Sequence, residues 1–320
     1  MRWMLAAVTG VLLLLQPAYF HFLRDWSGPH CSQTHCLPSP CQDARRDHLE
    51  AVCVEDRILQ DNLIRQGAAL IERGRTIGTA VLRQQLEVTS CQLDLPPPGP
   101  MISDPAEQFL IAKDSVVVVA GLYKCNRCSN WHADMASGFV IGADGAVVTN
   151  YHVVDSATER AMVVMTADFD VYPVQRVLAA SRADDLAILK VDAEGLRPLA
   201  LAGSTAAAPV GSAVSIISHP DGRFYCYTAG IVSRYMKTEL GGEAVDAVAV
   251  TAEYARGSSG APVLNHQGQV VAVVSSTESI YYSEDGQRQR DLQMVFRTCV
   301  PAASLLRMIR PAGQLAGRVP

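Results

Sequence analysis

Three side chains in this sequence have the types and local settings needed to activate a serine hydroxyl. His152 follows an apolar run, Asp185 opens the apolar run 186–189, and Ser259 takes the third place of the Gly-x-Ser-Gly motif at 257–260. A serine hydroxyl becomes a useful nucleophile when an imidazole accepts its proton and a carboxylate fixes the tautomer of that imidazole. The sequence therefore predicts acyl-transfer chemistry, with Ser259 as nucleophile, His152 as general base and Asp185 as the group that orients the base.

Neighbouring residues of the same types offer alternatives for two of these roles. Ser258 precedes Ser259, but only Ser259 occupies the third place of Gly-x-Ser-Gly. Asp184 precedes Asp185, but only Asp185 abuts the apolar run. The glycines allow a sharp turn, and we expect the backbone amides of Gly257 and Ser259 to form an oxyanion hole, in which each donor stabilises the transition state by about 3–4 kcal/mol.

The order His, Asp, Ser along the chain is that of the chymotrypsin type and differs from the orders in subtilisin and in the α/β-hydrolases. Segments 137–154, 185–191, 228–233 and 296–301 resemble sequence blocks of the HtrA/Deg branch of chymotrypsin-like (trypsin-like) serine peptidases. The resemblance runs from Glu107 to Ile309. It implies an all-β protease domain made of two six-stranded antiparallel β-barrels, with the triad in the cleft between them.

This resemblance also implies a serine endopeptidase that cleaves protein or peptide substrates without a cofactor. A latent or inactive scaffold with the same fold is the alternative. The family usually has Gly-Asn-Ser-Gly-Gly, whereas this chain has Ser258 and Ala261 around Ser259 and Gly260, so we expect altered packing there and intact chemistry. Classical members carry PDZ domains after the protease domain. Only residues 310–320 follow the resembling region, and we expect no PDZ domain.

Substrate preference has two candidate determinants. Glu253 lies six places before Ser259, where chymotrypsin-like enzymes often set the base of the S1 pocket. A carboxylate there would favour Lys or Arg at P1. In loops of the HtrA type the neighbouring residue, here Tyr254, can instead form the pocket wall and favour aliphatic side chains. Glu253 as an ordinary surface charge explains the sequence equally well.

Beyond residue 107 the chain contains many short apolar runs separated by Gly, Asp and Pro, which is typical of an antiparallel barrel or sandwich. These runs are 115–120, 138–142, 146–150, 161–165, 186–191, 213–217, 228–233, 246–251, 262–264 and 269–275. Pro301 followed by Leu305, Leu306 and Ile309 predicts a terminal helix that packs on the second barrel.

We expect six segments along the chain. They are a signal peptide or signal anchor at 1–23, a Cys/Pro-rich linker at 24–42, a helical segment at 43–91, a Pro-rich linker at 92–106, the protease domain at 107–312 and a tail at 313–320. The helical segment fits either a hairpin, in which Cys53 and Cys91 could be bridged, or a coiled coil that would form a homo-oligomer.

The N-terminal apolar stretch predicts export to the periplasm or the extracellular space. Residues 3–23 are long enough to stay in the membrane as an anchor, and the site of signal cleavage is a poor one. Nine cysteines fit an oxidising location. The net charge of −5 and the absence of a basic stretch with interleaved aromatic residues argue against nucleic-acid binding.

A further motif, Cys125-x-x-Cys128 followed by His132, could supply three ligands to zinc. No fourth ligand is visible nearby, and a disulfide explains the two cysteines equally well. The sequence alone therefore assigns no metal and no cofactor.

Overall fold

The computed structural model describes residues 53–102, 104–125, 127–157, 161–203, 208–240, 243–285 and 288–311. The predicted signal segment at 1–23, the linker at 24–42 and the start of the helical segment lie outside the described residues. Within the described ranges, no helix combines the length and the apolar character that a membrane crossing requires.

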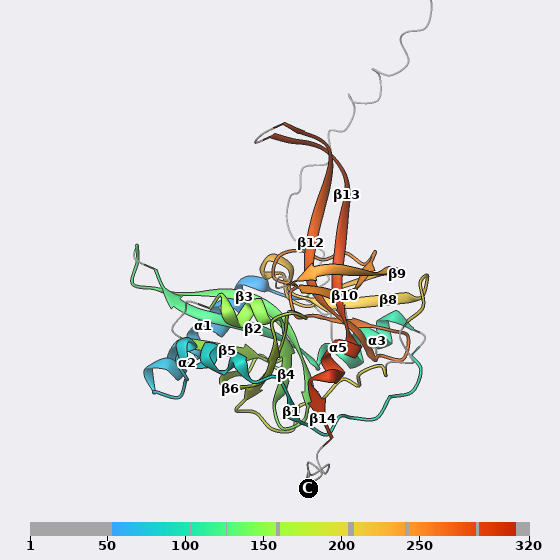
Figure 1. The fold of residues 1–320 in the computed structure, drawn as a ribbon. Helices are drawn as coiled ribbons and strands as arrows, with labels where there is room; N and C mark the ends of the chain where they lie inside the picture. Colours follow the sequence, from blue (N-terminus) through green and yellow to red (C-terminus); the bar gives the residue numbers. More distant parts are fainter. Residues whose placement is uncertain are drawn as a thin grey trace, which may run out of the picture. The chain divides into compact units, whose positions relative to one another are not determined.

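Two closed six-stranded barrels carry most of the described residues (Figure 1). The first barrel consists of β2 (Val116–Lys124), β3 (Trp131–Gly142), β4 (Ala146–Thr149), β7 (Leu186–Val191), β6 (Val171–Ser181) and β5 (Ala161–Met165), in that order around the barrel. The second consists of β10 (Glu243–Val250), β13 (Arg288–Pro301), β12 (Val270–Asp285), β11 (Pro262–Leu264), β8 (Ala213–Ser218) and β9 (Cys226–Leu240). Neighbouring strands in both barrels run antiparallel, so the expected fold class is confirmed.

Strand β2 shows why the apolar runs of this sequence are continuous instead of alternating. Val116 and Val118 belong to one buried cluster, and Val117 and Val119 belong to another, so both faces of the strand are covered. A strand that is buried on both faces gains from apolar residues at every position. All ten runs predicted from the sequence overlap strands of the two barrels, whereas β6 and β13 were not among them.

The N-terminal helices pack on the first barrel. They comprise α1 (Asp56–Glu72), α2 (Thr79–Gln84) and the short η1 (Gln85–Glu87). Leu59 and Leu63 of α1 are buried in the same cluster as β2 residues. Gly67 allows close approach, since a Cβ there would lie 2.6 Å from Leu122 Cδ1. Two of the apolar positions that a coiled coil would use, Leu59 and Leu63, are therefore covered by the chain's own barrel.

The bridge between Cys53 and Cys91 that the hairpin alternative allowed is not formed. Cys91 is a free thiol. It opens β1 (Cys91–Gln92), which pairs in parallel with β14 (Ile309–Arg310), and Cys91 lies opposite Ile309. Burial raises the pKa of its thiol to about 11.

The terminal helix is shorter than the sequence predicts. Helix α5 spans Ala302–Arg307 after Pro301 and contacts β12 and β13 of the second barrel. Ile309 lies beyond the helix because it belongs to β14 and pairs with β1. The strand pairing therefore ends the helix before the last residue of its apolar pattern.

A further helix, α3 (Pro105–Lys113), begins inside the segment expected to be a linker. Asp104 caps it by accepting a hydrogen bond from the Ala106 amide at 2.9 Å, and Pro105 takes the first helical position, where its missing N–H has no cost. Gln108 is buried and donates to the Asn265 carbonyl at 2.6 Å, which ties α3 to the second barrel.

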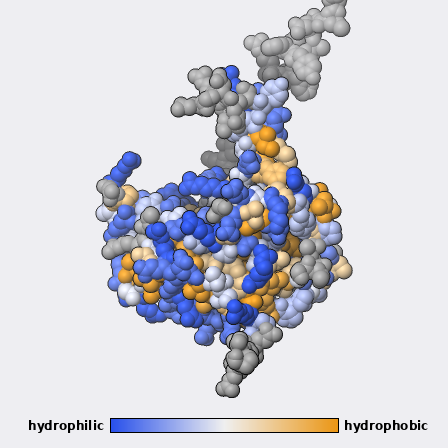
Figure 2. Space-filling model, in the orientation of Figure 1, coloured by the Kyte–Doolittle hydropathy of each residue, from blue (hydrophilic) through white to orange (hydrophobic). Residues whose placement is uncertain are grey.

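Strands β12 and β13 extend past the second barrel as a long projecting hairpin (Figure 1). Its far part carries the exposed apolar side chains Ile280, Tyr282, Leu292 and Met294. Figure 2 shows apolar colour on this hairpin, while polar residues cover most of the rest of the face in view.

Candidate active site

His152 is presented by α4 (Tyr151–Asp155), a single turn of helix that follows β4. Its imidazole Nδ1 lies 2.9 and 3.0 Å from the two carboxylate oxygens of Asp185. The His152 backbone amide also donates to Asp185 Oδ1 at 3.0 Å. Since a carboxylate only accepts, Nδ1 carries the proton, and Nε2 is left as the acceptor.

Asp185 sits in an unusual backbone conformation with φ at +52°. Its carbonyl accepts a hydrogen bond from the Asn150 side chain at 2.8 Å, and its Oδ2 accepts one from the Ser275 hydroxyl at 2.7 Å. Ser275 belongs to the second barrel, so both barrels hold this carboxylate. Asp184 instead accepts hydrogen bonds from Arg307 at 3.1 Å and from the Ser181 hydroxyl at 2.9 Å.

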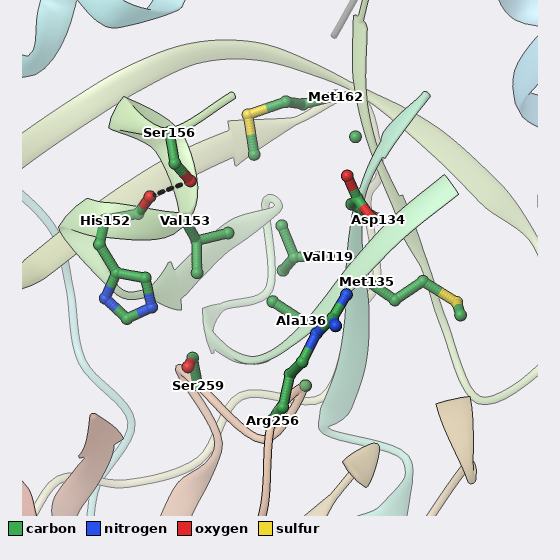
Figure 3. Close-up of a pocket in the computed structure, with 12 residues that line it drawn as sticks. Val119, Asp134, Met135, Ala136, His152, Val153, Ser156, Met162, Arg256 and Ser259 are labelled. Carbon is green, nitrogen blue, oxygen red and sulfur yellow. Dashed lines mark hydrogen bonds between the residues drawn. The ribbon is translucent and has the colours of Figure 1, made fainter. Parts of the chain in front are cut away.

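The two adjacent serines occupy different environments. Ser258 is fully buried, and its hydroxyl donates to Ser218 Oγ at 3.0 Å. Ser259 lines the same cavity as His152 (Figure 3). Its hydroxyl lies 3.5 Å from the Ser275 carbonyl, and among the described residues it forms no hydrogen bond with His152. Attack by Ser259 would therefore begin with a rotation of its side chain towards Nε2.

The loop that carries Ser259 is held by the first barrel. The Ser137 amide donates to the Ser259 carbonyl at 2.9 Å, and the Ser137 hydroxyl donates to the Gly257 carbonyl at 2.9 Å. Gly257 and Gly260 have φ values of +92° and +85°, which only glycine adopts readily. Within the described part of the chain, the amides of Gly257 and Ser259 donate to no protein group.

The cavity has a volume of about 380 Å³. Figure 3 shows His152 and Ser259 at one end and Asp134 and Met135 at the other, with Arg256 reaching between them. The remaining wall comes mainly from small and apolar residues of the first barrel, and the full lining is Val119, Gly121, Asp134, Met135, Ala136, His152, Val153, Ser156, Met162, Arg256, Gly257 and Ser259. The cavity thus combines an apolar wall with one carboxylate, one guanidinium and the imidazole of His152.

Neither residue considered for substrate preference lines this cavity. The Glu253 carboxylate is largely exposed and lies 3.2 Å from the Arg297 guanidinium. Tyr254 is buried in the second barrel, where its hydroxyl lies within hydrogen-bonding distance of the Ser276 and Thr298 carbonyls, and burial raises its pKa. Their role in specificity stays a prediction.

A second histidine lies behind the nucleophile loop. His219 is fully buried, its amide donates to Ser137 Oγ at 3.0 Å, and its Nδ1 accepts from the Tyr225 amide at 3.1 Å. Burial lowers its pKa to about 3, so the ring is neutral at physiological pH. His219 therefore stabilises the fold behind the loop and is not a candidate for the general base.

Sequence reasoning did not single out Ser275, Asn150 or Ser137. Each bonds a backbone or carboxylate group of the site from a distant point in the chain. Ser275 ends the predicted strand run 269–275 and looks there like any polar strand residue. Only the strand pairing of the two barrels reveals these contacts.

Comparison with known proteins agrees with this geometry. Residues 136–273 match the family model described as trypsin-like peptidase domain. The chain is 35% identical over 141 residues to a probable periplasmic serine endoprotease, DegP-like, of Ectopseudomonas mendocina, covering 44% of this chain and 29% of that relative. The corresponding protein of Halomonas elongata is 32% identical over 141 residues, again covering 44% and 29%. The chain therefore spans less than a third of the length of these relatives.

Solved structures share the fold. An HtrA-type protease, AlgW with decapeptide, superposes with a TM-score of 0.51 at 19% identity over 63% of this chain and 66% of that one. The Rv3671c protease from M. tuberculosis, in its active form, gives a TM-score of 0.50 at 23% identity over 69% of this chain and 95% of that one. The resemblance expected from the motifs is confirmed: residues 136–273 are similar to a trypsin-like peptidase domain, and the curated relatives matched are DegP-like serine endoproteases.

Proposed function

We propose that this protein is an exported serine endopeptidase that uses His152, Asp185 and Ser259. The observation that carries the proposal is the imidazole of His152, bonded to Asp185 at 2.9 Å and lining the same cavity as Ser259. The relatives named as serine endoproteases support peptide bonds as the substrate class.

In this mechanism His152 Nε2 accepts the proton of Ser259 as Oγ attacks the carbonyl carbon of a bound peptide. Asp185 keeps the proton on Nδ1 and stabilises the imidazolium. The amides of Gly257 and Ser259 stabilise the oxyanion. The imidazolium then protonates the leaving amine, and water hydrolyses the acyl-enzyme by the same route in reverse. This sequence of steps uses only side chains and backbone groups of the chain.

Export and assembly belong to the same proposal. The apolar N-terminal stretch and the relatives named as periplasmic support a location outside the cytoplasm. Retention of residues 3–23 as a membrane anchor and homo-oligomer formation through 43–91 stay predictions. N-terminal sequencing of the exported protein would test the first, and sedimentation equilibrium of the purified protein would test the second.

The decisive experiment is labelling of the purified protein with a fluorophosphonate, beside Ser259→Ala and Ser258→Ala. We expect labelling of the wild type and of Ser258→Ala, and none of Ser259→Ala. The Ser258 variant leaves the Ser218 hydroxyl without its donor, which costs about 1 kcal/mol of stability and leaves the nucleophile in place. A folded wild type that takes up no label would contradict the proposal and favour a latent scaffold.

A further inference from the structure

The hairpin of β2 and β3 brings together three metal-binding side chains. Cys125 and Cys128 lie in the turn of the hairpin, and His132 lies near the start of β3. One ligand atom from each lies within 4.8 Å of the other two. This cluster belongs to neither the cavity nor the triad, and its residues are partly or fully exposed. An ion can therefore reach it directly from solvent.

The distances within the cluster suit a shared ion. Cys125 Sγ lies 3.1 Å from Cys128 Sγ, and Cys128 Sγ lies 3.0 Å from His132 Nε2. In a tetrahedral zinc site the bond lengths place sulfur and nitrogen ligands roughly 3.6–3.8 Å from one another. Cys128 Sγ therefore needs to move about 0.5–0.7 Å away from each of its two neighbours, while Cys125 Sγ and His132 Nε2 already lie within 4.8 Å of each other. The turn of an exposed hairpin can open by that amount.

A disulfide explains less of the arrangement. Cys125 and Cys128 are both free thiols, and their separation of 3.1 Å is well beyond the roughly 2.05 Å of an S–S bond. The position of the His132 imidazole favours a metal site, because a disulfide would involve only the two sulfur atoms and would not explain a nitrogen ligand beside them. The His132 ring stacks on Tyr123, its partner across the strands, with ring centroids 5.4 Å apart. This stacking orients Nε2 towards the thiols.

From these observations we infer that Cys125, Cys128 and His132 bind one zinc ion, with water at the fourth position. Thiolate and imidazole donors favour zinc over magnesium or calcium, which prefer oxygen ligands. Within the described residues no fourth Cys, His, Asp or Glu joins the group, so the site is open in the manner of a three-ligand zinc site. Zinc binds the thiolate forms of the two cysteines and the neutral form of the imidazole.

The position of the site gives the ion a structural effect near the cavity. Strand β3 continues from His132 to Asp134, Met135 and Ala136, which line the cavity of Ser259. Zinc would join the turn of the hairpin to the beginning of this strand. The site itself does not depend on the proposed peptidase activity, because zinc bound per chain can be measured without any turnover.

The test uses the full chain in reduced form and measures zinc by competition with a chromophoric chelator. Comparison of wild type with Cys125→Ser, Cys128→Ser and His132→Ala isolates this site from the cysteines before residue 54. Cys226→Ser is the matched control, because Cys226 is also a free, partly exposed thiol and lies outside the cluster. We expect each cluster variant to lose one equivalent of zinc, or to bind it at least about 100-fold more weakly, and the control to retain it.

Cobalt gives a second, independent measurement on the wild type. Bound Co²⁺ should show thiolate-to-metal charge transfer and the intense visible bands of a tetrahedral ion, and both should disappear in Cys128→Ser and persist in Cys226→Ser. Magnesium and calcium should not compete. Equal zinc content in the wild type and all three cluster variants would overturn the assignment. So would a Cys125–Cys128 disulfide in protein isolated with zinc present.

Discussion

Replacement of Gly260 by alanine tests how closely the nucleophile loop approaches the first barrel. Gly260 follows Ser259 and has a φ of +85°. A Cβ there would collide with the Ser137 carbonyl oxygen and lie 2.5 Å from Thr149 Oγ1 and 2.9 Å from Thr149 Cα. The left-handed conformation costs an L-residue about 1–2 kcal/mol. Because backbone atoms cannot move aside cheaply, overpacking adds about 1–3 kcal/mol.

Gly195→Ala is the matched control for this change. Its φ is +71°, and no atom lies within 4 Å of a Cβ built there, so it carries the conformational cost without the collision. Urea unfolding of both variants should therefore give a free energy of unfolding about 1–3 kcal/mol lower for Gly260→Ala than for Gly195→Ala. Fluorophosphonate labelling should fall only in Gly260→Ala. Equal stability in the two variants, with labelling at the wild-type rate in both, would refute the close approach.

Three further predictions concern the stability of the protein at acidic pH, the role of the Asp185 carboxylate and the packing of helix α1. The pKa of His219 is about 3 in the folded state, below its ordinary value near 6.5, so the unfolded chain binds a proton first and the free energy of unfolding falls as pH drops from 6.5 towards 3. His219→Asn keeps an acceptor for the Tyr225 amide and removes the titrating ring. It should flatten the pH dependence of the urea midpoint in that window, and an unchanged slope would exclude His219 as its source. Asp185→Asn should slow labelling by about 10⁴-fold, and a loss of less than tenfold would count against its orienting role. Leu63→Ala should lower the free energy of unfolding by about 2–5 kcal/mol, whereas Ile58→Ala, at an exposed position of the same helix, should change it by about 0.5 kcal/mol or less in urea titrations. Similar values for the two would mean that α1 is not part of the core.

Much of the fold can be predicted from the sequence where burial on both faces makes a strand continuously apolar. The run 115–120 is such a case. Strand β6 is harder, because it contains Pro173 and exposed polar positions such as Arg176. The far parts of β12 and β13 lie outside the barrel and have no buried face to impose a pattern. The length of the hairpin therefore depends on the pairing of β12 with β13, and the pattern of apolar residues within either strand does not predict this pairing.

For the candidate site, local sequence selects residues but not their partners. Gly-x-Ser-Gly favours Ser259 over Ser258, and in the structure Ser258 is buried against Ser218 while Ser259 lines the cavity. The spacing rule that singled out Glu253 counts residues along a loop. In the structure Glu253 instead accepts a hydrogen bond from Arg297, which lies 44 residues further along the chain. The spacing of residues within the loop cannot predict this contact.

At this site the hydrogen bonds between the barrels mainly position the reacting groups, whereas the apolar contacts mainly stabilise the fold. Ser275 and Ser137 donate three hydrogen bonds across the boundary, to Asp185, Gly257 and Ser259. Each contributes about 0.5–1.5 kcal/mol when neutral and about 1.5–3 kcal/mol when it reaches a charged group. One buried apolar cluster contains side chains of both barrels, including fully buried Val148 and Val273.

Each fully buried side chain in that cluster contributes about 1.5–3 kcal/mol, and the cluster holds many of them. Apolar burial in this cluster therefore contributes more free energy than the three directional bonds, which fix the positions of the loop and the carboxylate. Ser275→Ala should consequently alter the labelling rate more than the free energy of unfolding, and Val273→Ala should do the reverse. Parallel losses of both quantities in both variants would show that the two roles are not separable.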